Sequence, residues 1–422
     1  MKQFKRIKGT QDILPPESRQ WAALENLIHE IMERYNFHEI RTPVFEQTEL
    51  FARGIGQLTD IVSKEMYSFQ DRGKKQITLK PEMTAPVMRA FIENKMYAQQ
   101  PIHKLYYIAS LFRQEKPQAG RLRQFHQFGA ETIGSADPAA DIEMIDLAVA
   151  IYKKTGLKDL QLSINSVGDP LCRNRFRKIL QDYIRPNLNL YCEDCKKRFE
   201  TNPMRILDCK NESCIKLNEQ APKLTDYLCD GCAEHYKQLK SGLDNLGIAY
   251  RENPYLVRGL DYYTRTVFEI TSGALGAQNA VCGGGRYDLL AEELGGMPTP
   301  ATGFAAGMER LLLVLQSQQI DMAETTGLDV FIIGMENDAR PIIDKTLLKL
   351  RNAGYRCDQD LLKRSIKAQM REANRQAARY VLIIGENELN SGKFAVKDMS
   401  NGIQTEIKFE DIENFLEQQK LI

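Results

Sequence analysis

Two strand-like runs on either side of a turn-forming loop place the strongest constraint on how this chain can fold. The runs cover residues 105–113 and 124–133, and the loop between them contains Pro117 and Gly120. Strand-like runs joined by a loop of this composition form antiparallel hairpins. Asp137 and Pro138 then begin a helix that Gly156 ends. We therefore expect an antiparallel sheet in this part of the chain.

The last hundred residues follow a different pattern. Strand-like runs at 329–334, 355–359 and 380–385 alternate with helical segments, and two further strands and a last helix follow. This alternation predicts a separate α/β domain with a mostly parallel sheet. A segment rich in Gln, Ser and Thr at 316–327 has the composition of a linker. A chain of 422 residues is also too long for one ordinary core, so two or three domains are expected.

Composition excludes several classes of protein. The net charge is +1, so any contact with nucleic acid must come from local patches rather than from bulk attraction. No apolar run reaches the roughly 18–20 residues that a membrane span needs. The N-terminus lacks the apolar core of a signal peptide, so we expect a cytoplasmic protein. The chain contains no Gly-x-x-x-x-Gly-Lys-Ser/Thr motif, and a P-loop is therefore not expected.

Cysteines are concentrated in an insertion-like region at about 170–250, which shows no sustained hydrophobic period. Cys192 and Cys195 form one Cys-x-x-Cys pair, Cys229 and Cys232 form a second, and further cysteines lie between them. Two such pairs are typical of a structural zinc site. Three alternatives remain open at this point: a site made of both pairs, a site in which Cys209 and Cys214 replace one pair, and free thiols.

Three arginines stand in contexts that favour anion binding. Arg113 ends the first strand of the expected hairpin, and Arg258 precedes a glycine. Arg310 lies on an expected helix that comes after Gly303 and Gly307 in the sequence. The fixed fork of a guanidinium suits carboxylate and phosphate groups, whereas a single arginine is more often a solvated surface residue. We interpret the glycines before Arg310 as leaving room for a nucleotide, and the glycine cluster at 283–285, taken alone, as a flexible turn.

Four segments together resemble histidyl-tRNA synthetases of the bacterial type. They are Leu-Phe-Arg-Gln-Glu-Lys at 111–116, Arg-Gly-Leu-Asp-Tyr-Tyr at 258–263, Gly-Gly-Gly-Arg-Tyr-Asp at 283–288, and the run 301–310. The resemblance covers nearly the whole chain. It implies an α+β class II catalytic domain at 1–320, an antiparallel sheet flanked by helices, interrupted by the insertion at about 170–250. It also implies an α/β anticodon-binding domain at 327–422.

The same resemblance implies an activity and its partners. The expected enzyme is a histidine–tRNA ligase that forms histidyl adenylate from L-histidine and ATP with Mg²⁺, and then transfers histidine to tRNA(His). A homodimer is expected, joined through a helix at 17–35 and a strand at 39–46 that has Pro43 at an edge or bend. Residues at helical spacing near 363–375 would give the C-terminal domain one basic face toward tRNA, unless they form a solvated helix: Lys363, Arg364, Lys367, Arg371 and Arg375.

The resemblance also assigns site residues. The catalytic residues would be Arg258, Arg113 and Arg310. Histidine would be bound by Glu82, Thr84, Arg113, Gln127, Glu131, Arg258, Tyr262, Tyr263 and Tyr287. ATP would contact Arg113, Glu115, Arg121, Phe125, Arg258 and Arg310. The tRNA acceptor end would meet Gln118 and Arg123, and zinc, if present, would be held by Cys192, Cys195, Cys229 and Cys232. Gln127 and Glu131 are four residues apart, so on a strand both side chains lie on one face.

Two departures and one rival function accompany this interpretation. Lys80 and Met83 stand where the family commonly has Arg and Gly, which leaves substrate affinity open. The rival is a catalytically inactive relative, such as the regulatory subunit of ATP phosphoribosyltransferase. That protein lacks the anticodon domain and loses the arginines. The C-terminal α/β pattern and the retained arginines of this chain favour the ligase.

Overall fold

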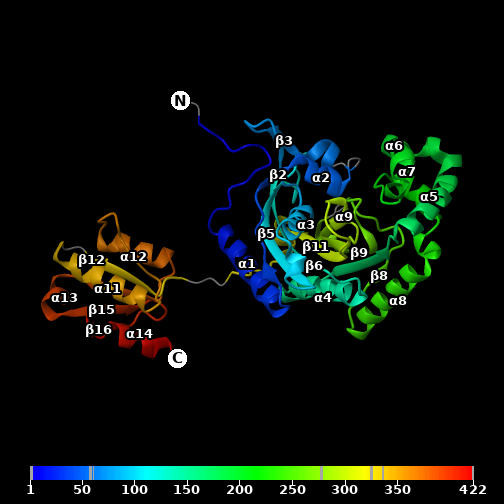
Figure 1. Ribbon diagram of the computed structural model, residues 1–422. Coiled ribbons are helices and arrows are strands. Elements are labelled where there is room, and N and C mark those ends of the chain that lie inside the picture. The colour runs from blue at the N-terminus through cyan, green and yellow to red at the C-terminus, as the bar shows by residue number, and fades with distance from the viewer. Residues whose placement is uncertain are drawn as a thin grey trace. The chain divides into compact units, whose positions relative to one another are not determined.

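The computed structural model describes residues 3–56, 59, 61–275, 279–323, 327–334 and 337–420. The chain divides into two compact units, Met1–Ala323 and Glu324–Ile422 (Figure 1). Part of the expected linker, residues 324–326, lies outside the described residues. Among the described residues, no helix is both long enough and apolar enough to cross a membrane.

An eight-stranded sheet forms the centre of the first unit, in the order β1-β5-β6-β11-β10-β9-β7-β8. The strands are β1 (His38–Glu39), β5 (His103–Phe112), β6 (Gln124–Ile133), β7 (Leu160–Ser166), β8 (Arg251–Glu252), β9 (Thr264–Ser272), β10 (Ala280–Arg286) and β11 (Ala301–Gly307). The hairpin predicted from the Pro/Gly loop is confirmed, because β5 and β6 pair antiparallel with Ala109 opposite Gln127. Only the short edge strands β1 and β8 pair parallel to their neighbours in the described sheet.

Alternation along the central strands gives each face of the sheet its own core. Tyr106, Phe128 and Phe304 pack on one face with helices α1 (Glu17–Arg34), α4 (Pro138–Lys154) and α10 (Met308–Ser317). The opposite face carries Tyr107 and the tyrosines near residue 262, packed with α3 (Thr84–Glu93) and α9 (Leu290–Glu293). Successive side chains of a strand point to opposite faces. Gln127 and Glu131 therefore share the second face, as their spacing predicts.

The first unit also contains a second, smaller sheet, whose three strands follow the order β2-β4-β3. Its strands are β2 (Phe45–Gln47), β3 (Tyr67–Gln70) and β4 (Gln76–Leu79), and α2 (Thr48–Ile55) and a π-helical turn (Ile61–Glu65) follow β2. The single strand expected at 39–46 is wrong. It forms β1 in the main sheet and β2 in the small one, with Pro43, which has no backbone N–H to donate to a ladder, between them.

The insertion is helical. It contains α5 (Pro170–Ile184), α6 (Glu193–Thr201), α7 (Glu212–Asn218) and α8 (Asp230–Asn245), joined by short 3₁₀ turns. α5, α6 and α7 stand together beside the sheet (Figure 1). They share a small core that includes Phe176, Leu180 and Phe199. α8 instead returns to the main core, where Leu239 and Leu243 are fully buried.

The second unit is built on a five-stranded sheet in the order β13-β12-β14-β15-β16. Its strands are β12 (Val330–Gly334), β13 (Cys357–Gln359), β14 (Tyr380–Ile384), β15 (Lys393–Asp398) and β16 (Gln404–Lys408), and its helices are α11 (Arg340–Asn352), α12 (Ile366–Arg375), α13 (Glu386–Ser391) and α14 (Ile412–Lys420). β12 pairs parallel with β13 and β14, whereas β14, β15 and β16 pair antiparallel. The prediction of a mostly parallel sheet is therefore wrong. Only the short helix α13 separates β14 from β15, and β16 follows β15 directly, so these strands pair antiparallel.

The basic residues near 363–375 do not form one helical face. α12 begins at Ile366, so Lys363 and Arg364 precede the helix. Arg364 pairs with Asp360 and Glu372, and Arg375 also pairs with Glu372. These ion pairs remove two of the five cations from a free basic surface, and Lys363, Lys367 and Arg371 remain exposed.

Candidate active site

A cavity of about 420 Å³ lies on the second face of the main sheet. Its volume is in the range of small-molecule binding sites. Every residue predicted for histidine or ATP lines it except Glu131, which lies directly behind the lining. The predicted residues that line it are Glu82, Thr84, Arg113, Glu115, Arg121, Phe125, Gln127, Arg258, Tyr262, Tyr263, Tyr287 and Arg310.

Glu131 is the centre of a buried hydroxyl network at one end of the cavity. It accepts hydrogen bonds from the hydroxyls of Tyr287, Thr84 (3.1 Å) and Tyr107 (3.3 Å). Burial raises the pKa of Glu131 to about 8, and these hydroxyls offset only part of that rise. Space for the carboxylate comes from Gly303 on the neighbouring strand, where an added Cβ would lie 1.6 Å from Glu131 Oε2. Glu131 therefore fills the position of a Gly303 side chain, while Gly303 and Gly307 both line the cavity, and the room they leave for a nucleotide stays a prediction.

Glu82 is held by the first turn of α3. Its two carboxylate oxygens accept hydrogen bonds from the backbone N–H groups of Thr84 (2.7 Å) and Ala85 (2.9 Å). Burial still raises its pKa, and the backbone bonds partly oppose the rise. Beside it the aromatic wall is close-packed, because the Tyr262 ring lies 4.7 Å from Tyr263 and 5.5 Å from Tyr287, centroid to centroid.

Arg258 is fixed at the other end of the cavity by an ion pair with Glu269. Burial opposes its charge, but the Glu269 carboxylate reverses that effect and the pKa of Arg258 is raised. The guanidinium lies against Gly283, where an added Cβ would be only 1.9 Å from Arg258 Nη2. The glycine cluster at 283–285 is thus part of the buried strand β10 and not a flexible turn. At Gly283 the missing side chain provides the space for Arg258.

Two further arginines line the same cavity. The Nε of Arg113 donates to the carbonyl oxygen of Pro81 (3.0 Å), and its guanidinium lies 5.2 Å from the ring centre of Phe125. Arg310 donates to the carbonyl oxygens of Ala280 (2.7 Å) and Gly120 (3.3 Å). Burial lowers the pKa of both arginines, so an anionic ligand placed between them would recover interactions that desolvation removes.

Gln118 and Arg123 belong to the hairpin loop and do not line the cavity. The backbone of Gln118 bonds to Arg121 across the turn, and Arg123 donates to the carbonyl oxygen of Lys8 at 3.4 Å. Arg123 therefore fastens this part of the loop to the N-terminal segment, whereas Glu115, Gly120 and Arg121 of the same loop line the cavity.

The two Cys-x-x-Cys pairs do not come together, so the expected set of Cys192, Cys195, Cys229 and Cys232 is wrong. Cys192 and Cys195 instead lie with Cys209 and Cys214, which is the alternative in which these two cysteines replace one pair. Cys229 and Cys232 lie with Cys172 and Asp169. The reason is that each pair begins a different helix, and α6 packs in the small core of the insertion whereas α8 packs in the main core.

Sequence reasoning missed several residues of this site, and three of them act on Arg258. Glu269 faces Gly283 across β9 and β10, a relation that appears only in the strand register. Arg205 donates from Nη1 to the carbonyl oxygen of Arg258 (2.9 Å), and Asp208 lines the cavity beside it. Both come from the insertion, where no motif pointed to the cavity.

The two departures from the family pattern lie next to one another. Lys80 is buried, and its Nζ donates to the backbone and hydroxyl oxygens of Thr42, each at 3.3 Å. Burial lowers its pKa. Lys80 does not line the cavity, whereas Met83 does. Of the two departures, only Met83 is therefore placed to contact a ligand.

Comparisons with known proteins agree on one family. The family model for histidyl-tRNA synthetase matches residues 9–183 and 200–311, and the anticodon binding domain model matches residues 329–419. The chain is 50% identical to a histidine–tRNA ligase of Caldanaerobacter subterraneus subsp. tengcongensis over 97% of this chain and 98% of the relative. It is 49% identical to one of Halothermothrix orenii over 99% of each.

A solved structure gives the same result for the fold. The apo histidyl-tRNA synthetase of S. aureus matches with a TM-score of 0.83 and 41% identity, over 98% of this chain and all of the other. The prediction of a class II synthetase fold with a C-terminal anticodon-binding domain is confirmed, and the inactive regulatory subunit is set aside. The chain belongs to the histidyl-tRNA synthetase family.

Proposed function

We propose that the cavity between the β5–β6 hairpin and the segment 257–263 is where this histidine–tRNA ligase forms histidyl adenylate. The observation that carries this proposal is the pairing of a buried carboxyl and hydroxyl network with three arginines in one space of about 420 Å³. One end offers partners for an imidazole and an α-ammonium. The other end offers cations for phosphates.

The reaction places two anions next to each other. A carboxylate oxygen of histidine attacks the α-phosphorus of ATP, the bond from that phosphorus to the bridging oxygen breaks, and pyrophosphate leaves. Arg258 and Arg113 lie on opposite sides of the α-phosphate in this proposal, and Arg310 holds the distal phosphates. Preorganised cations stabilise the charge that develops in the transition state and lower the barrier to attack. Glu115, Arg121 and Phe125 complete the nucleotide site, with the Phe125 ring beside the base.

Histidine is held by the buried end of the same cavity. Glu82, Thr84 and Gln127 accept hydrogen bonds from the α-ammonium, and Glu131 and Tyr263 bond the two imidazole nitrogens. Tyr262 and Tyr287 form the walls. A site that bonds both nitrogens rejects analogues that lack one, because its own polar groups would be left unpaired.

Mg²⁺ enters this scheme as part of the substrate MgATP. Carboxylates are the protein ligands that Mg²⁺ takes. The carboxylates lining the cavity all accept bonds from protein donors already: Glu82, Glu115, Asp208, Glu269 and Glu309. The residues present therefore fit an ion carried in by the phosphates better than one held by the protein alone. Zinc has no part in the chemical step, and we assign it to the cysteines of the insertion.

The tRNA contacts both units in this proposal. Its 3′ end reaches the adenylate past the hairpin loop that carries Gln118 and Arg123, and a ribose hydroxyl takes the histidyl group while AMP leaves. The anticodon is read by the unit at 327–422. Charging takes place in the cytoplasm, and tRNA(His) is the expected partner.

A homodimer is supported by an exposed apolar face on the small sheet. Phe45 lies opposite Leu79, and Phe69 lies opposite Ile77, so all four side chains share one face. Phe45 and Phe69 are 54% and 47% exposed. Contiguous exposed apolar residues mark interaction surfaces. Sedimentation velocity should show a dimer that Phe45→Glu dissociates, whereas Leu361→Glu, at an exposed leucine of the other unit, leaves it intact.

The decisive experiment for the adenylate site is histidine-dependent exchange of labelled pyrophosphate into ATP. We expect exchange with histidine and none with the other amino acids. Removing residues 327–422 should then abolish aminoacylation of tRNA while part of the exchange activity remains. Exchange without histidine, or a truncated protein that charges tRNA at the full rate, would contradict the proposed division of labour.

A further inference from the structure

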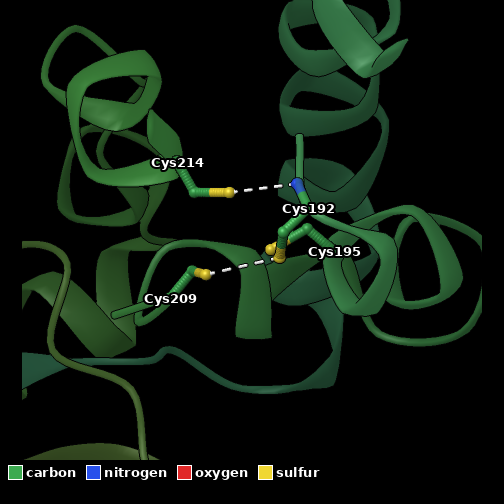
Figure 2. Close-up of side chains that lie close together, drawn as sticks. All are labelled: Cys192, Cys195, Cys209 and Cys214. Carbon is green, nitrogen blue, oxygen red and sulfur yellow. Dashed lines mark hydrogen bonds between the residues drawn. The ribbon is translucent and has the colours of Figure 1, made fainter. Parts of the chain in front are cut away.

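Four cysteines of the insertion meet around a common centre. Cys192 caps the N-terminus of α6, Cys195 lies in its first turn, Cys209 lies in the loop before α7, and Cys214 lies within α7. Their sulfur atoms all lie within 4.8 Å of one another. Figure 2 shows the four side chains turned toward one another. None of these cysteines forms a disulfide.

The spacing fits a metal better than it fits disulfides. Cys192 Sγ and Cys209 Sγ are 3.8 Å apart. Zinc–sulfur bonds of about 2.3 Å arranged in a tetrahedron place neighbouring sulfurs about 3.8 Å apart, whereas a disulfide needs about 2.05 Å. The backbone N–H of Cys192 also donates to Cys214 Sγ at 3.3 Å, as outer-shell donors do to metal-bound thiolates. Four sulfur ligands select Zn²⁺ over the oxygen-preferring Mg²⁺ and Ca²⁺.

We propose that Cys192, Cys195, Cys209 and Cys214 bind a structural Zn²⁺ ion that braces the wall of the catalytic cavity next to Arg258. The ion ties α6 to α7 and to the loop between them. The core beneath these helices is small, and metals commonly stabilise such regions.

The proposed ion is linked to the cavity wall by the residues on either side of Cys209. Asp208 and Lys210 line the cavity, and Arg205 donates to the carbonyl oxygen of Arg258 at 2.9 Å. The backbone N–H of Cys209 bonds to Ile206, so the segment 205–210 is one short turn fastened at Cys209. The consequence for catalysis rests on the role proposed for Arg258, whereas the presence of the ion does not.

Zinc content tests the site directly. The protein is purified without added metal, and zinc per chain is measured for Cys209→Ser and for Cys357→Ser, a matched control at a buried cysteine of the second unit. We expect one zinc fewer per chain in Cys209→Ser. Equal zinc in the two variants, or a mass of the denatured protein lower by two hydrogen atoms for each disulfide, would overturn the site.

A spectroscopic measurement covers the case in which Cys209→Ser fails to fold. In Cys232→Ser, the other group of cysteines in the insertion loses one of its thiols, while Cys192, Cys195, Cys209 and Cys214 are unchanged. The zinc of this variant is replaced with Co²⁺. A tetrahedral cobalt–thiolate spectrum, with sulfur-to-metal charge transfer in the near ultraviolet, is expected. The weak bands of an octahedral ion without charge transfer would overturn the proposal.

Exchange kinetics test the brace separately. Cys209→Ser and Arg205→Ala both release the segment 205–210, and each should lower kcat/KM for pyrophosphate exchange about tenfold. Cys357→Ser should not change it. If Cys209→Ser loses its zinc and keeps full exchange activity, the ion is structural without bracing the cavity. Normal exchange in Arg258→Ala would instead refute the proposed catalytic role and leave the zinc measurement standing.

A second ion is indicated by an independent group. The ligand atoms of Asp169, Cys172, Cys229 and Cys232 also lie within 4.8 Å of one another. These residues begin α5 and α8, so an ion here fastens the two ends of the insertion. The expected content of the wild type is then two zinc ions per chain, of which Cys172→Ser should lose one and Cys209→Ser the other. A Cys172→Ser protein with the zinc content of Cys357→Ser would overturn this second site.

Discussion

Burial affects the charged groups at the two ends of the catalytic cavity differently. At the histidine end, burial drives Glu131 toward its neutral form, and hydroxyls of Tyr107 and Tyr287 complete its hydrogen bonds. At the phosphate end, burial works against the arginines, and the carboxylate of Glu269 keeps Arg258 charged. The hydrogen-bonding groups of the first end distinguish an imidazole from side chains that lack its two nitrogens. The second end keeps fixed charges where a transition state needs them.

Removing the charge at Arg258 should have the largest effect. We expect Arg258→Ala to slow pyrophosphate exchange by about 10³-fold, roughly 4 kcal/mol, because a charge aimed at the developing transition state contributes mainly to rate. Dissociation constants for histidine and ATP should change far less. Pre-steady-state kinetics separate the two quantities, and Arg340→Ala, at an exposed ion pair of the other unit, provides the control. A normal exchange rate in Arg258→Ala would show that the phosphate end does not depend on this charge for catalysis.

Changing Glu131 tests the histidine end. In Glu131→Gln we expect the KM for histidine to rise about 10- to 100-fold, while the KM for ATP stays nearly constant, since one imidazole partner is replaced by an amide with different donors. Tyr263→Phe should act in the same direction with a smaller effect. Equal changes in both KM values would place the histidine pocket elsewhere.

Replacing Glu269 examines the link that sequence reasoning missed. Glu269→Gln keeps the shape of the side chain but removes the charge that holds Arg258 in place and raises its pKa. We expect the rate of exchange to fall about tenfold, less than in Arg258→Ala, because the guanidinium remains present but less well positioned. In the double variant with Arg258→Ala, the Glu269 change should have almost no further effect. Additive losses would show that Glu269 acts independently of Arg258.

Sequence patterns predicted the hairpin, the helices after it and most of the cavity lining, because these depend on local spacing. The positions of Gln127 and Glu131 on one face followed directly from strand alternation. Relations that depend on pairing between distant segments could not be read from the sequence. The contact of Arg258 with Glu269 across Gly283 depends on the register of β9 and β10.

The cysteines show the same limit in another way. Two Cys-x-x-Cys motifs look equivalent in a sequence, and only the packing of α6 and α8 separates them into two groups. The split of residues 39–46 between two sheets likewise depends on tertiary contacts, although Pro43 marked the place where it occurs. Local chemistry was therefore readable from the sequence, whereas the partners of each group were not.

The smallest expected effect concerns pH and stability at the histidine end. The pKa of Glu131 is raised to about 8 in the folded chain, well above the ordinary value of a glutamate. Between about pH 4.5 and pH 8 the folded chain therefore holds a proton that the unfolded chain has released, so this group makes stability fall as pH rises, by at most about 1.4 kcal/mol per pH unit. Glu131→Gln lacks this proton. The difference in unfolding temperature between wild type and Glu131→Gln, measured at pH 5.5 and pH 7.5, should shift in favour of the variant at the higher pH. Parallel pH curves for the two proteins would mean that Glu131 is ionised in the folded state, and the contrast between the two ends would then rest on geometry alone.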